Sequence, residues 1–161
     1  MGVEIERKFL VTSDRWRDLA PGVLYRQGYI PTQPGRTVRV RIAGGRAFVT
    51  IKGDSQGISR SEFEYSIPIE DANELLDSLC ASPLIEKYRH KIDINGLTWE
   101  VDEFLGENRG LVIAEVELEN ADQAIERPDW IGEDVSHDAR YYNSNLVTHP
   151  FSRWQPMSRL Q

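Results

Sequence analysis

Glutamates at alternate positions are the residues of this sequence best placed to do chemistry. Such Glu-x-Glu pairs occur at 4/6, 62/64, 115/117 and 117/119. Alternate side chains of a strand point to one face and start roughly 7 Å apart, so two long carboxylates can converge on one cation. At ~4 Å and an effective dielectric of ~20 they repel by about 4 kcal/mol, and a divalent cation removes that cost. The pairs therefore predict sites for hard, oxygen-preferring cations such as Mg²⁺ or Mn²⁺.

Basic residues alternate in the same way and predict an anion site. Arg39 and Arg41 share one face of the segment 37–43, and Lys87 and Arg89 share one face of 84–93. Arginine grips phosphate oxygens with two parallel hydrogen bonds, whereas lysine acts as a point charge. The full basic set is Lys8, Arg39, Arg41, Lys52, Arg60, Lys87, Arg89 and Lys91. A polyphosphate bridged by metal ions would satisfy the basic and the acidic residues at once.

The two signs of charge are segregated by segment. The polar faces of 37–43, 46–52 and 84–93 are basic, whereas those of 97–104 and 110–119 are acidic. An antiparallel sheet often has one polar face that meets only water, but such a surface usually intersperses signs to avoid repulsion. The segregation favours a cavity with an acidic wall and a basic wall over a plain solvated face.

Period-two alternation predicts that the fold is mainly β, within an α+β class. The expected strands are 3–11, 24–30, 37–43, 46–52, 59–67, 84–93, 97–104 and 110–119. Gly44-Gly45 and Asn95-Gly96 separate neighbouring strands and are strong hairpin signals. Eight strands with short connections indicate an antiparallel sheet that curls or closes.

Helical spacing is less common in this chain. Leu75, Leu76, Leu79 and Cys80 predict a helix over 70–81, with Pro83 beyond its end. Three shorter helices are expected: one after Thr12 or Ser13, one from Asn120 to Arg127, and one that starts after Ser136 and carries Tyr141, Tyr142 and Leu146.

The composition sets the class of protein. The 161 residues fit one domain over 1–149, followed by a tail over 150–161 that is either frayed or a docking segment. The net charge of −7 argues against nucleic acid as the main partner. No apolar run is long enough to cross a membrane, and no secretory signal is evident. The single Cys80 excludes an intramolecular disulfide and favours a cytoplasmic location.

The run Glu4-Ile5-Glu6-Arg7-Lys8 matches the ExExK signature of a known family. Further elements follow in order over nearly the whole chain: Arg39-Val-Arg41, Thr50-Ile-Lys52, Arg60-Ser-Glu62-Phe-Glu64, Glu86-Lys87-Tyr-Arg89, Trp99-Glu-Val-Asp102, Ala114-Glu115-Val-Glu117 and Asp134-Val-Ser-His-Asp-Ala-Arg140-Tyr141. With these elements the chain resembles the CYTH superfamily, the triphosphate tunnel metalloenzymes, and within it the short bacterial inorganic triphosphatases.

The resemblance implies a closed eight-stranded antiparallel β-barrel with flanking helices, enclosing a charged tunnel in which Mg²⁺ or Mn²⁺ assists the cleavage of a small triphosphate. It implies that the metal ligands are Glu4, Glu6, Glu115 and Glu117, assisted by Glu62, Glu64 and Asp102. It implies that the triphosphate is bound by Lys8, Arg39, Arg41, Lys52, Lys87 and Arg89, with Arg60 on the tunnel wall. It also implies roles in the reaction for Lys8, Tyr29, Glu62, Glu64 and Lys87.

The family leaves several activities open. Inorganic triphosphate is the favoured substrate, to be hydrolysed to pyrophosphate and phosphate, with Glu62, Glu64, Glu115 or Glu117 as the proton acceptor. The alternatives are an adenylate cyclase that makes cyclic AMP and pyrophosphate, a thiamine triphosphatase, and a non-catalytic polyphosphate or nucleotide sensor. A monomer and a homodimer are both compatible with the sequence.

The remaining conspicuous residues are expected to serve packing. His90 should lie on the outer face with Tyr88, and Cys80 should be a buried structural thiol. Arg140 and Tyr141 either reach the tunnel end or lie on a solvated helix face. The tryptophans expected to pack are Trp16, Trp99, Trp130 and Trp154.

Overall fold

The computed structural model describes residues 2–154, and the end of the predicted tail, 155–161, lies outside them. All the predicted strands are present, with ends shifted by at most two residues. They are β1 (Gly2–Val11), β2 (Gly22–Tyr29), β3 (Thr37–Ala43), β4 (Arg46–Lys52), β5 (Ser59–Ile67), β6 (Ile85–Ile94), β7 (Leu97–Phe104) and β8 (Val112–Glu117). An unpredicted short strand, β9 (Ile131–Asp134), follows.

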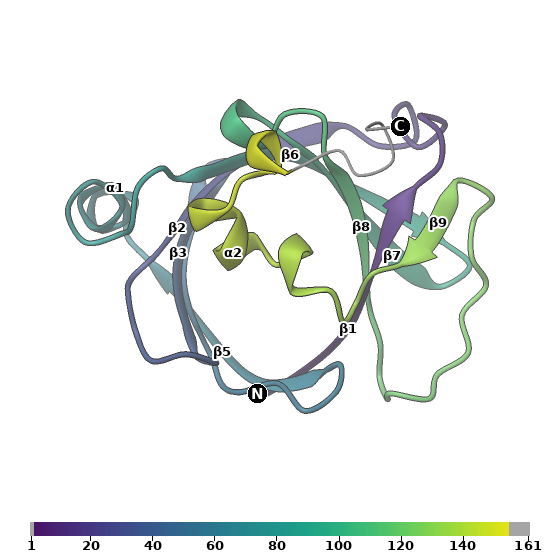
Figure 1. The fold of residues 1–161 in the computed structure, drawn as a ribbon, viewed down its shortest axis with the longest axis horizontal. Coiled ribbons are helices and arrows are strands. Elements are labelled where there is room, and N and C mark those ends of the chain that lie inside the picture. The colour runs from purple at the N-terminus through teal and green to yellow at the C-terminus, as the bar shows by residue number, and fades with distance from the viewer. Residues whose placement is uncertain (1, 155–161) are drawn as a thin grey trace.

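The strands form one antiparallel sheet that closes on itself. Its order is β5-β4-β3-β2-β6-β7-β8-β1-β9, and an additional pairing between β5 and β1 completes the barrel (Figure 1). The hairpin signals are confirmed: β3 joins β4 at Gly44 (φ 61°), and β6 joins β7 at Asn95 (φ 52°) and Gly96 (φ 82°). Positive φ at both Asn95 and Gly96 is what a tight type I′ hairpin needs. The predicted closed barrel is confirmed.

Strand β9 lies outside the closed barrel. The first residues of β1 pair with β5, while Phe9 and Val11 pair with Asp134 and Ile131 of β9. β9 is only four residues long and contains a single large apolar residue. Alternation cannot be recognised over so short a segment, which is why the sequence pattern did not predict it.

The hydrophobic core lies on the outside of the barrel, because the inward face is charged. The largest cluster packs Phe9 and Trp99 against Trp16 and Trp130, which come from the segments that flank β1 and β9. The rings of Phe9 and Trp99 are 5.6 Å apart. The expected packing roles of these tryptophans are confirmed, and the loops that carry them cover the outer face of β1, β7 and β8.

The one long predicted helix is present as α1 (Ile69–Ser78), and it covers the outer face of β2, β3 and β4. Ala72 and Leu76 are buried against Val40 and Ala47. The helix ends before the predicted residue 81, so Cys80 follows it instead of belonging to it. Cys80 is partly buried, and burial raises the pKa of its thiol.

Two predicted short helices are wrong. Residues 12–20 form bends and turns, and residues 120–127 form turns and irregular chain. In the second segment the Asn120 side chain accepts a hydrogen bond from the Asp122 amide, and the Gln123 side chain accepts one from the Glu119 amide. Such side-chain to backbone bonds compete with helix formation.

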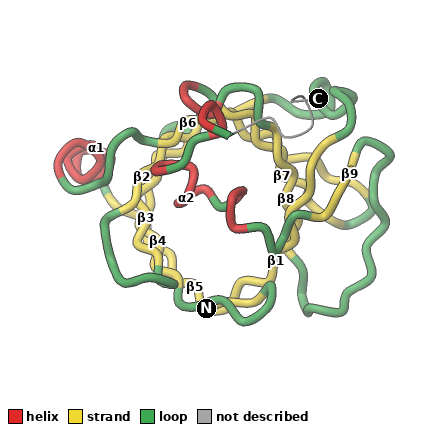
Figure 2. The backbone as a smooth tube through the Cα atoms, viewed as in Figure 1, coloured by secondary structure: helices red, strands yellow, loops and turns green. Residues whose placement is uncertain are grey.

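The helix predicted after Ser136 is broken into two pieces, the 3₁₀ turn η2 (Ala139–Tyr141) and α2 (Asn143–Thr148). Tyr142 separates them in an extended conformation. Viewed along the barrel axis, α2 lies within the outline of the barrel (Figure 2). Two further 3₁₀ turns, η1 (Gly106–Asn108) and η3 (Phe151–Arg153), complete the described chain, and Trp154 packs on Tyr141 with ring centroids 5.1 Å apart. Among the described residues, no helix has the length and apolarity needed to cross a membrane.

Candidate active site: a charged cavity inside the barrel

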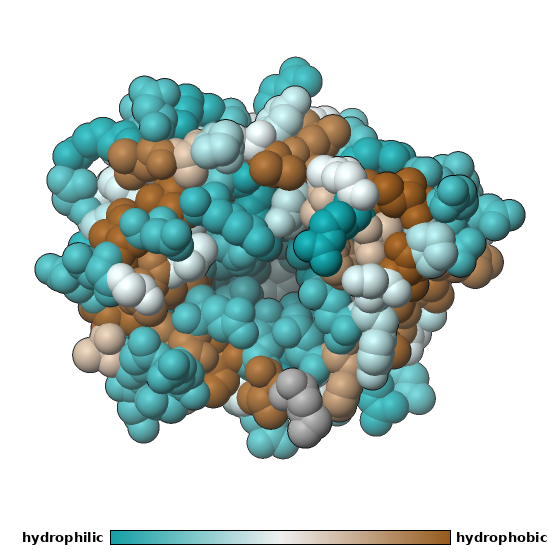
Figure 3. All heavy atoms as spheres, turned by 180° about the vertical axis from the view of Figure 1, so that it is seen from behind, coloured by the Kyte–Doolittle hydropathy of each residue, from teal (hydrophilic) through white to brown (hydrophobic). Residues whose placement is uncertain are grey.

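A cavity of about 340 Å³ occupies the barrel interior, at the small end of the range of roughly 300–1,000 Å³ for small-molecule sites. Figure 3 shows the hollow at the end of the barrel opposite the viewpoint of Figure 1, with mostly hydrophilic residues around it. The predicted site residues that line the cavity are Glu4, Glu6, Lys8, Tyr29, Arg39, Arg41, Lys52, Arg60, Glu62, Glu64, Lys87, Arg89, Glu115 and Glu117. Asp102 is not among them.

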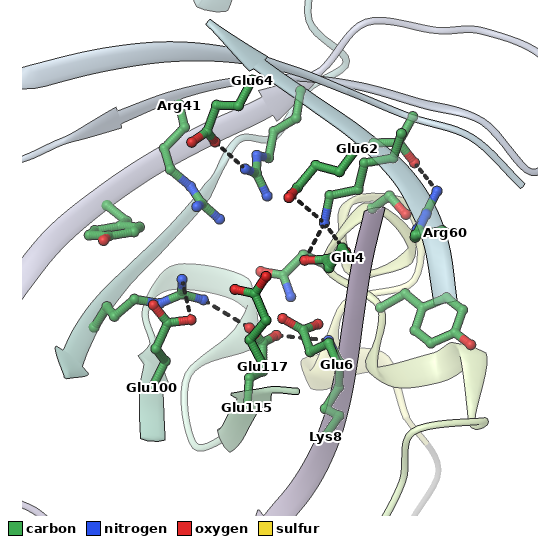
Figure 4. Close-up of a pocket in the computed structure, with 18 of the residues that line it drawn as sticks. Glu4, Glu6, Lys8, Arg41, Arg60, Glu62, Glu64, Glu100, Glu115 and Glu117 are labelled. Carbon is green, nitrogen blue, oxygen red and sulfur yellow. Dashed lines mark hydrogen bonds and ion pairs between the residues drawn. The ribbon is translucent and has the colours of Figure 1, made fainter. Parts of the chain in front are cut away.

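Carboxylates gather on one wall. Glu6, Glu100 and Glu115 each offer an oxygen, and these atoms lie within 4.8 Å of one another. Glu117 is on the same side of the cavity (Figure 4). Burial, with Glu115 and Glu4 nearby, raises the pKa of Glu6 well above its ordinary value. The group therefore carries more negative charge than its surroundings compensate, and its oxygen donors fit Mg²⁺ or Mn²⁺.

Glu115 links the acidic cluster to the basic wall. It accepts hydrogen bonds from Lys8 Nζ at 2.9 Å and from Arg89 Nη2 at 3.1 Å. Burial raises the pKa of Glu115, but the charges of Lys8 and Arg89 outweigh it, and the net pKa lies well below the ordinary value. Glu115 is therefore ionised at neutral pH.

Asp102 lies behind the wall, fully buried. Its Oδ2 accepts hydrogen bonds from Lys87 Nζ at 2.7 Å and Arg89 Nη2 at 2.8 Å, and its Oδ1 accepts one from Arg89 Nε at 2.7 Å. Burial lowers the pKa of Lys87, and Arg89 and Arg41 lower it further, to about 7 despite the opposing charge of Asp102. The carboxylate holds two basic residues in place from the side away from the cavity.

The other acidic residues face the opposite wall of the barrel. Lys52 Nζ lies 2.9 Å from Glu4 and 3.6 Å from Glu62. Arg39 donates to Thr50 Oγ1 at 3.0 Å and lies 3.3 Å from Glu64. Burial, with Glu4 nearby, raises the pKa of Glu62. Here most cations and carboxylates neutralise each other in pairs.

Arg41 differs from the rest of the basic wall. It is 9% exposed, and within residues 2–154 no carboxylate oxygen lies within 4.0 Å of its side-chain nitrogens. Its Nε donates to Gln27 Oε1 at 2.8 Å, and its guanidinium lies 4.9 Å from the centre of the Tyr25 ring. Burial, with Arg39 and Arg89 nearby, lowers the pKa of Arg41. The charge of this guanidinium is therefore destabilised until an anion reaches it.

The remaining predicted residues occupy the edges of the cavity. Tyr29 accepts a hydrogen bond at Oη from Gln27 Nε2 at 2.7 Å. Arg60 donates to the Gly53 carbonyl at 3.0 Å and to Thr37 Oγ1 at 3.3 Å. Lys91 lines the cavity with 58% of its side chain exposed, 3.8 Å from Glu100.

The sequence analysis missed several lining residues. Glu100 shares the polar face of β7 with Asp102, so the alternation pattern contained the signal for it. Tyr25 and Asn143 also line the cavity, and the buried Gln27 donates a hydrogen bond to Asn143. All three are neutral, and they follow no charge pattern that marks a site. Asn143 accepts a hydrogen bond from Lys87 Nζ at 2.9 Å, which only the folded position of α2 reveals.

The residues expected to pack do so. His90 points away from the cavity, where its Nδ1 is 2.8 Å from the Ala20 carbonyl and its ring packs edge-on against Trp16. Arg140 pairs with Asp138 at 2.7 Å in an exposed position. Tyr141 is instead buried against Trp154, so both alternatives predicted for Tyr141 are wrong. Of the alternatives for Arg140, the solvated surface is the one observed.

The family assignment follows from the match of the chain to known sequences. Residues 2–147 match the CYTH domain, which spans all eight barrel strands and most of α2. This chain belongs to the CYTH domain family. The charged cavity is therefore the interior of a CYTH barrel.

Two relatives share most of their length with this CYTH protein. An inorganic triphosphatase of Acetivibrio thermocellus is 54% identical over 155 residues, which cover 96% of this chain and 99% of that protein. An inorganic triphosphatase of Nitrosomonas europaea is 37% identical over 148 residues, covering 89% and 96% of the two chains.

Solved structures share the barrel. The crystal structure of an inorganic triphosphatase superimposes with a TM-score of 0.64 at 32% identity, covering 94% of this chain and 99% of that one. A structure from Bacillus halodurans, assigned as an adenylate cyclase, superimposes with a TM-score of 0.62 at 17% identity, covering 75% and 84%. At that identity the second likeness concerns the fold alone.

Proposed function

We propose that this protein hydrolyses inorganic triphosphate to pyrophosphate and phosphate with the help of Mg²⁺ or Mn²⁺. One observation carries the proposal: two incomplete sets of charge line one cavity. Glu6, Glu100 and Glu115 bring carboxylate oxygens within 4.8 Å of one another, and the buried Arg41 has no carboxylate oxygen within 4.0 Å among residues 2–154. A triphosphate that carries a divalent cation supplies both missing charges. The names of the two curated relatives support the same substrate.

The cation would be held by the carboxylates of the acidic wall. Glu6, Glu100 and Glu115 would hold it first, with Glu4 and Glu117 beside them. When bound, such a cation supplies a Lewis acid that withdraws charge from phosphate oxygens and acidifies water. The pKa values of Glu6 and Glu117 are raised, so we expect cation binding to displace protons from this wall.

The phosphate chain would lie against the basic wall. Arg41 is ready for it without breaking an existing ion pair, whereas Arg39 and Lys52 must share their carboxylate partners with it. Lys8, Lys87 and Arg89 line the same cavity. These cations stabilise the charge that builds up on the leaving pyrophosphate.

The reaction needs one proton acceptor. The oxygen of a water molecule attacks the terminal phosphorus, the bond from that phosphorus to the bridging oxygen breaks, and the bridging oxygen leaves with pyrophosphate. We assign Glu117 to take the proton of the water, because burial and its neighbours Glu4 and Glu62 raise the pKa of Glu117. Glu115 is less suited, since its pKa is lowered by Lys8 and Arg89.

We assign Asp102 a positioning role instead of the metal role that the sequence implied. Its oxygens already accept hydrogen bonds from Lys87 and Arg89, and it does not line the cavity. The single cysteine, Cys80, supports a cytoplasmic location as part of the same proposal.

The test is phosphate release by the purified protein from inorganic triphosphate, ATP and thiamine triphosphate, each with Mg²⁺, Mn²⁺ or EDTA. We expect fast, metal-dependent cleavage of inorganic triphosphate and little from the other two. Glu4→Gln and Glu117→Gln should abolish the activity while the far-ultraviolet circular dichroism spectrum stays unchanged. Glu74→Gln, an exposed glutamate on α1, is the matched control and should keep full activity.

The alternatives give different products. Pyrophosphate and cyclic AMP from ATP, without free phosphate, would identify an adenylate cyclase, and preferential cleavage of thiamine triphosphate would identify that substrate. Binding without turnover would identify a sensor. Turnover that survives in Glu4→Gln would mean that the carboxylates are assigned wrongly.

A further inference from the structure

A polar network crosses one end of the cavity and ends on α2. Asn143 Oδ1 accepts a hydrogen bond from Lys87 Nζ at 2.9 Å and one from Gln27 Nε2 at 3.4 Å. Tyr142, Asn143 and Ser144 line the cavity at this end. The C-terminal segment therefore forms part of the wall of the cavity, in addition to packing against the barrel.

Gln27 joins three other members of this network. It is 0% exposed, its Oε1 accepts from Arg41 at 2.8 Å, and its Nε2 donates to Tyr29 Oη at 2.7 Å. Burying a primary amide is costly unless its donors and acceptors are satisfied. The network thus fixes Arg41, Tyr29 and Lys87 relative to Asn143.

The two ends of the cavity differ. α2 lies within the barrel outline at the end seen in Figure 1, whereas the opposite end is hollowed in Figure 3. Along β1, Lys8 is the lining residue next to the α2 end, since its Nζ lies 5.9 Å from the centre of the Tyr142 ring. Glu6 and Glu4 follow on the same face toward the start of the strand. A chain that enters from the hollowed end passes the carboxylates before it reaches Lys87 and Asn143.

We propose that the α2 end is a recognition site for the terminal, unesterified phosphoryl group of a linear phosphate chain, with Asn143 and Gln27 as its positioning residues. This inference rests on the proposed function and adds the direction in which the substrate lies. One end of the chain must be free to enter the α2 end, whereas the end at the hollow can carry a substituent.

Charge favours a terminal group at this end. A terminal phosphoryl group carries about −1.5 to −2 charges at pH 7, whereas a doubly linked phosphoryl group carries one. Arg41 and Lys87 both face this part of the cavity, and Arg41 has no carboxylate partner in the described chain. An ester group would place an apolar or bulky substituent against Lys87 and the Asn143 amide, where it would leave their hydrogen bonds unmade.

The test compares inhibition constants of four compounds against hydrolysis of tripolyphosphate in Mg²⁺. ATP and tetrapolyphosphate have at least one free end, diadenosine triphosphate has both ends blocked, and trimetaphosphate is a ring without ends. We expect the two compounds without a free end to bind at least about tenfold more weakly, the change expected for one or two lost hydrogen bonds to a charged group. Trimetaphosphate has no free end and carries no adenosine, so it distinguishes the effect of the missing end from the steric effect of the adenosines.

Variants of Asn143 test the positioning role. Asn143→Ala should raise KM for tripolyphosphate roughly tenfold with a smaller change in kcat. Asn143→Asp keeps an acceptor for Lys87 but places a negative charge beside the phosphoryl group, so its KM should rise further. Thr148→Ala, at an exposed position of the same helix, is the matched control and should behave as the wild type.

The outcomes separate the two proposals. If tripolyphosphate is not hydrolysed by the wild type, the proposed function fails and this inference fails with it. If it is hydrolysed but blocked and free compounds inhibit equally, only the recognition of the chain end is overturned. Equal KM values for Asn143→Asp and the wild type would show that Asn143 serves only to hold α2 in place.

Discussion

At the scale of single residues, the cavity holds charges that the folded chain does not neutralise by itself. Glu6 is the sharpest case. Its raised pKa means that the folded, metal-free protein keeps this proton more tightly than the unfolded chain does. As the pH rises above about 4.5, the ordinary glutamate value, ionisation of Glu6 therefore costs stability.

We predict that Glu6→Gln stabilises the metal-free protein and removes its response to metal. The melting temperature in EDTA at neutral pH should rise by a few degrees, and the gain should vanish as the pH falls below about 4.5. Differential scanning calorimetry in EDTA and in Mn²⁺ measures both effects. Glu74→Gln should show neither. A lower melting temperature for Glu6→Gln in EDTA would contradict the raised pKa.

Tyr25 lies close to two arginines of the basic wall. Its ring centre lies 4.9 Å from the guanidinium of Arg41 and 5.1 Å from that of Arg89. Each cation–π contact contributes about 0.5–2 kcal/mol. We predict that Tyr25→Leu raises KM for tripolyphosphate roughly tenfold, because both guanidinia lose their support. Tyr88→Leu, on the outer face of β6, is the control for steady-state kinetics, and an equal effect there would discount the role of Tyr25.

The sequence pattern identified most of the charged residues of the site, but it missed Glu100 and the neutral residues Gln27 and Asn143. Charges on alternate positions had to face one way, so Glu4, Glu6, Arg39 and Arg41 could be placed together before any fold was known. Gln27 and Asn143 belong to separate elements, and their partnership depends on how α2 crosses the barrel. No local pattern contains that information.

At the scale of elements, strands were predictable and short helices were not. Most barrel strands have a charged face toward the cavity and an apolar face outward, so alternation persists along their length, whereas β2 contributes the neutral Tyr25 and Tyr29 to the lining. Residues 120–127 have helical composition, but the hydrogen bonds that Asn120 and Gln123 accept from nearby amides, together with Pro128, hold them in turns and irregular chain. Tertiary position and local capping decide such segments, and neither follows from spacing.

The covering helix α1 packs on the outer face of the barrel and contributes no residue to the lining of the cavity. Leu76 is 3% exposed and packs against the outer face of the barrel. We predict that Leu76→Ala lowers the free energy of unfolding by about 2–5 kcal/mol, which corresponds to a melting temperature roughly 10 °C lower. The kcat of the folded protein at low temperature should stay unchanged. Leu79→Ala, at a position 56% exposed, should alter neither quantity. A changed kcat for Leu76→Ala would show that α1 and the site are coupled.

At the scale of the whole molecule, the barrel is polar inside and apolar outside, and its stability depends on how well the interior charges are matched. Several buried pairs, such as Lys87 with Asp102, are complete in the folded chain. Breaking such a pair leaves a buried charge and costs about 3–5 kcal/mol. Glu6 and Arg41 differ from these pairs, because the folded chain does not fully neutralise their charges. Ligands that supply the counter-charge can therefore stabilise the fold.

This arrangement predicts that cation and phosphate chain stabilise the protein cooperatively. A ligand that binds only the folded state raises the melting temperature, and two ligands that supply counter-charge to each other strengthen each other's binding reciprocally. Pyrophosphate is the suitable probe, because the proposed reaction releases it. We expect the melting-temperature rise with excess Mg²⁺ and pyrophosphate together to exceed the sum of the rises with Mg²⁺ alone and with pyrophosphate in EDTA. Sulfate at equal ionic strength controls for screening. Additive shifts would mean that the acidic and basic walls bind independently, and that the cavity does not hold a metal–phosphate complex as one ligand.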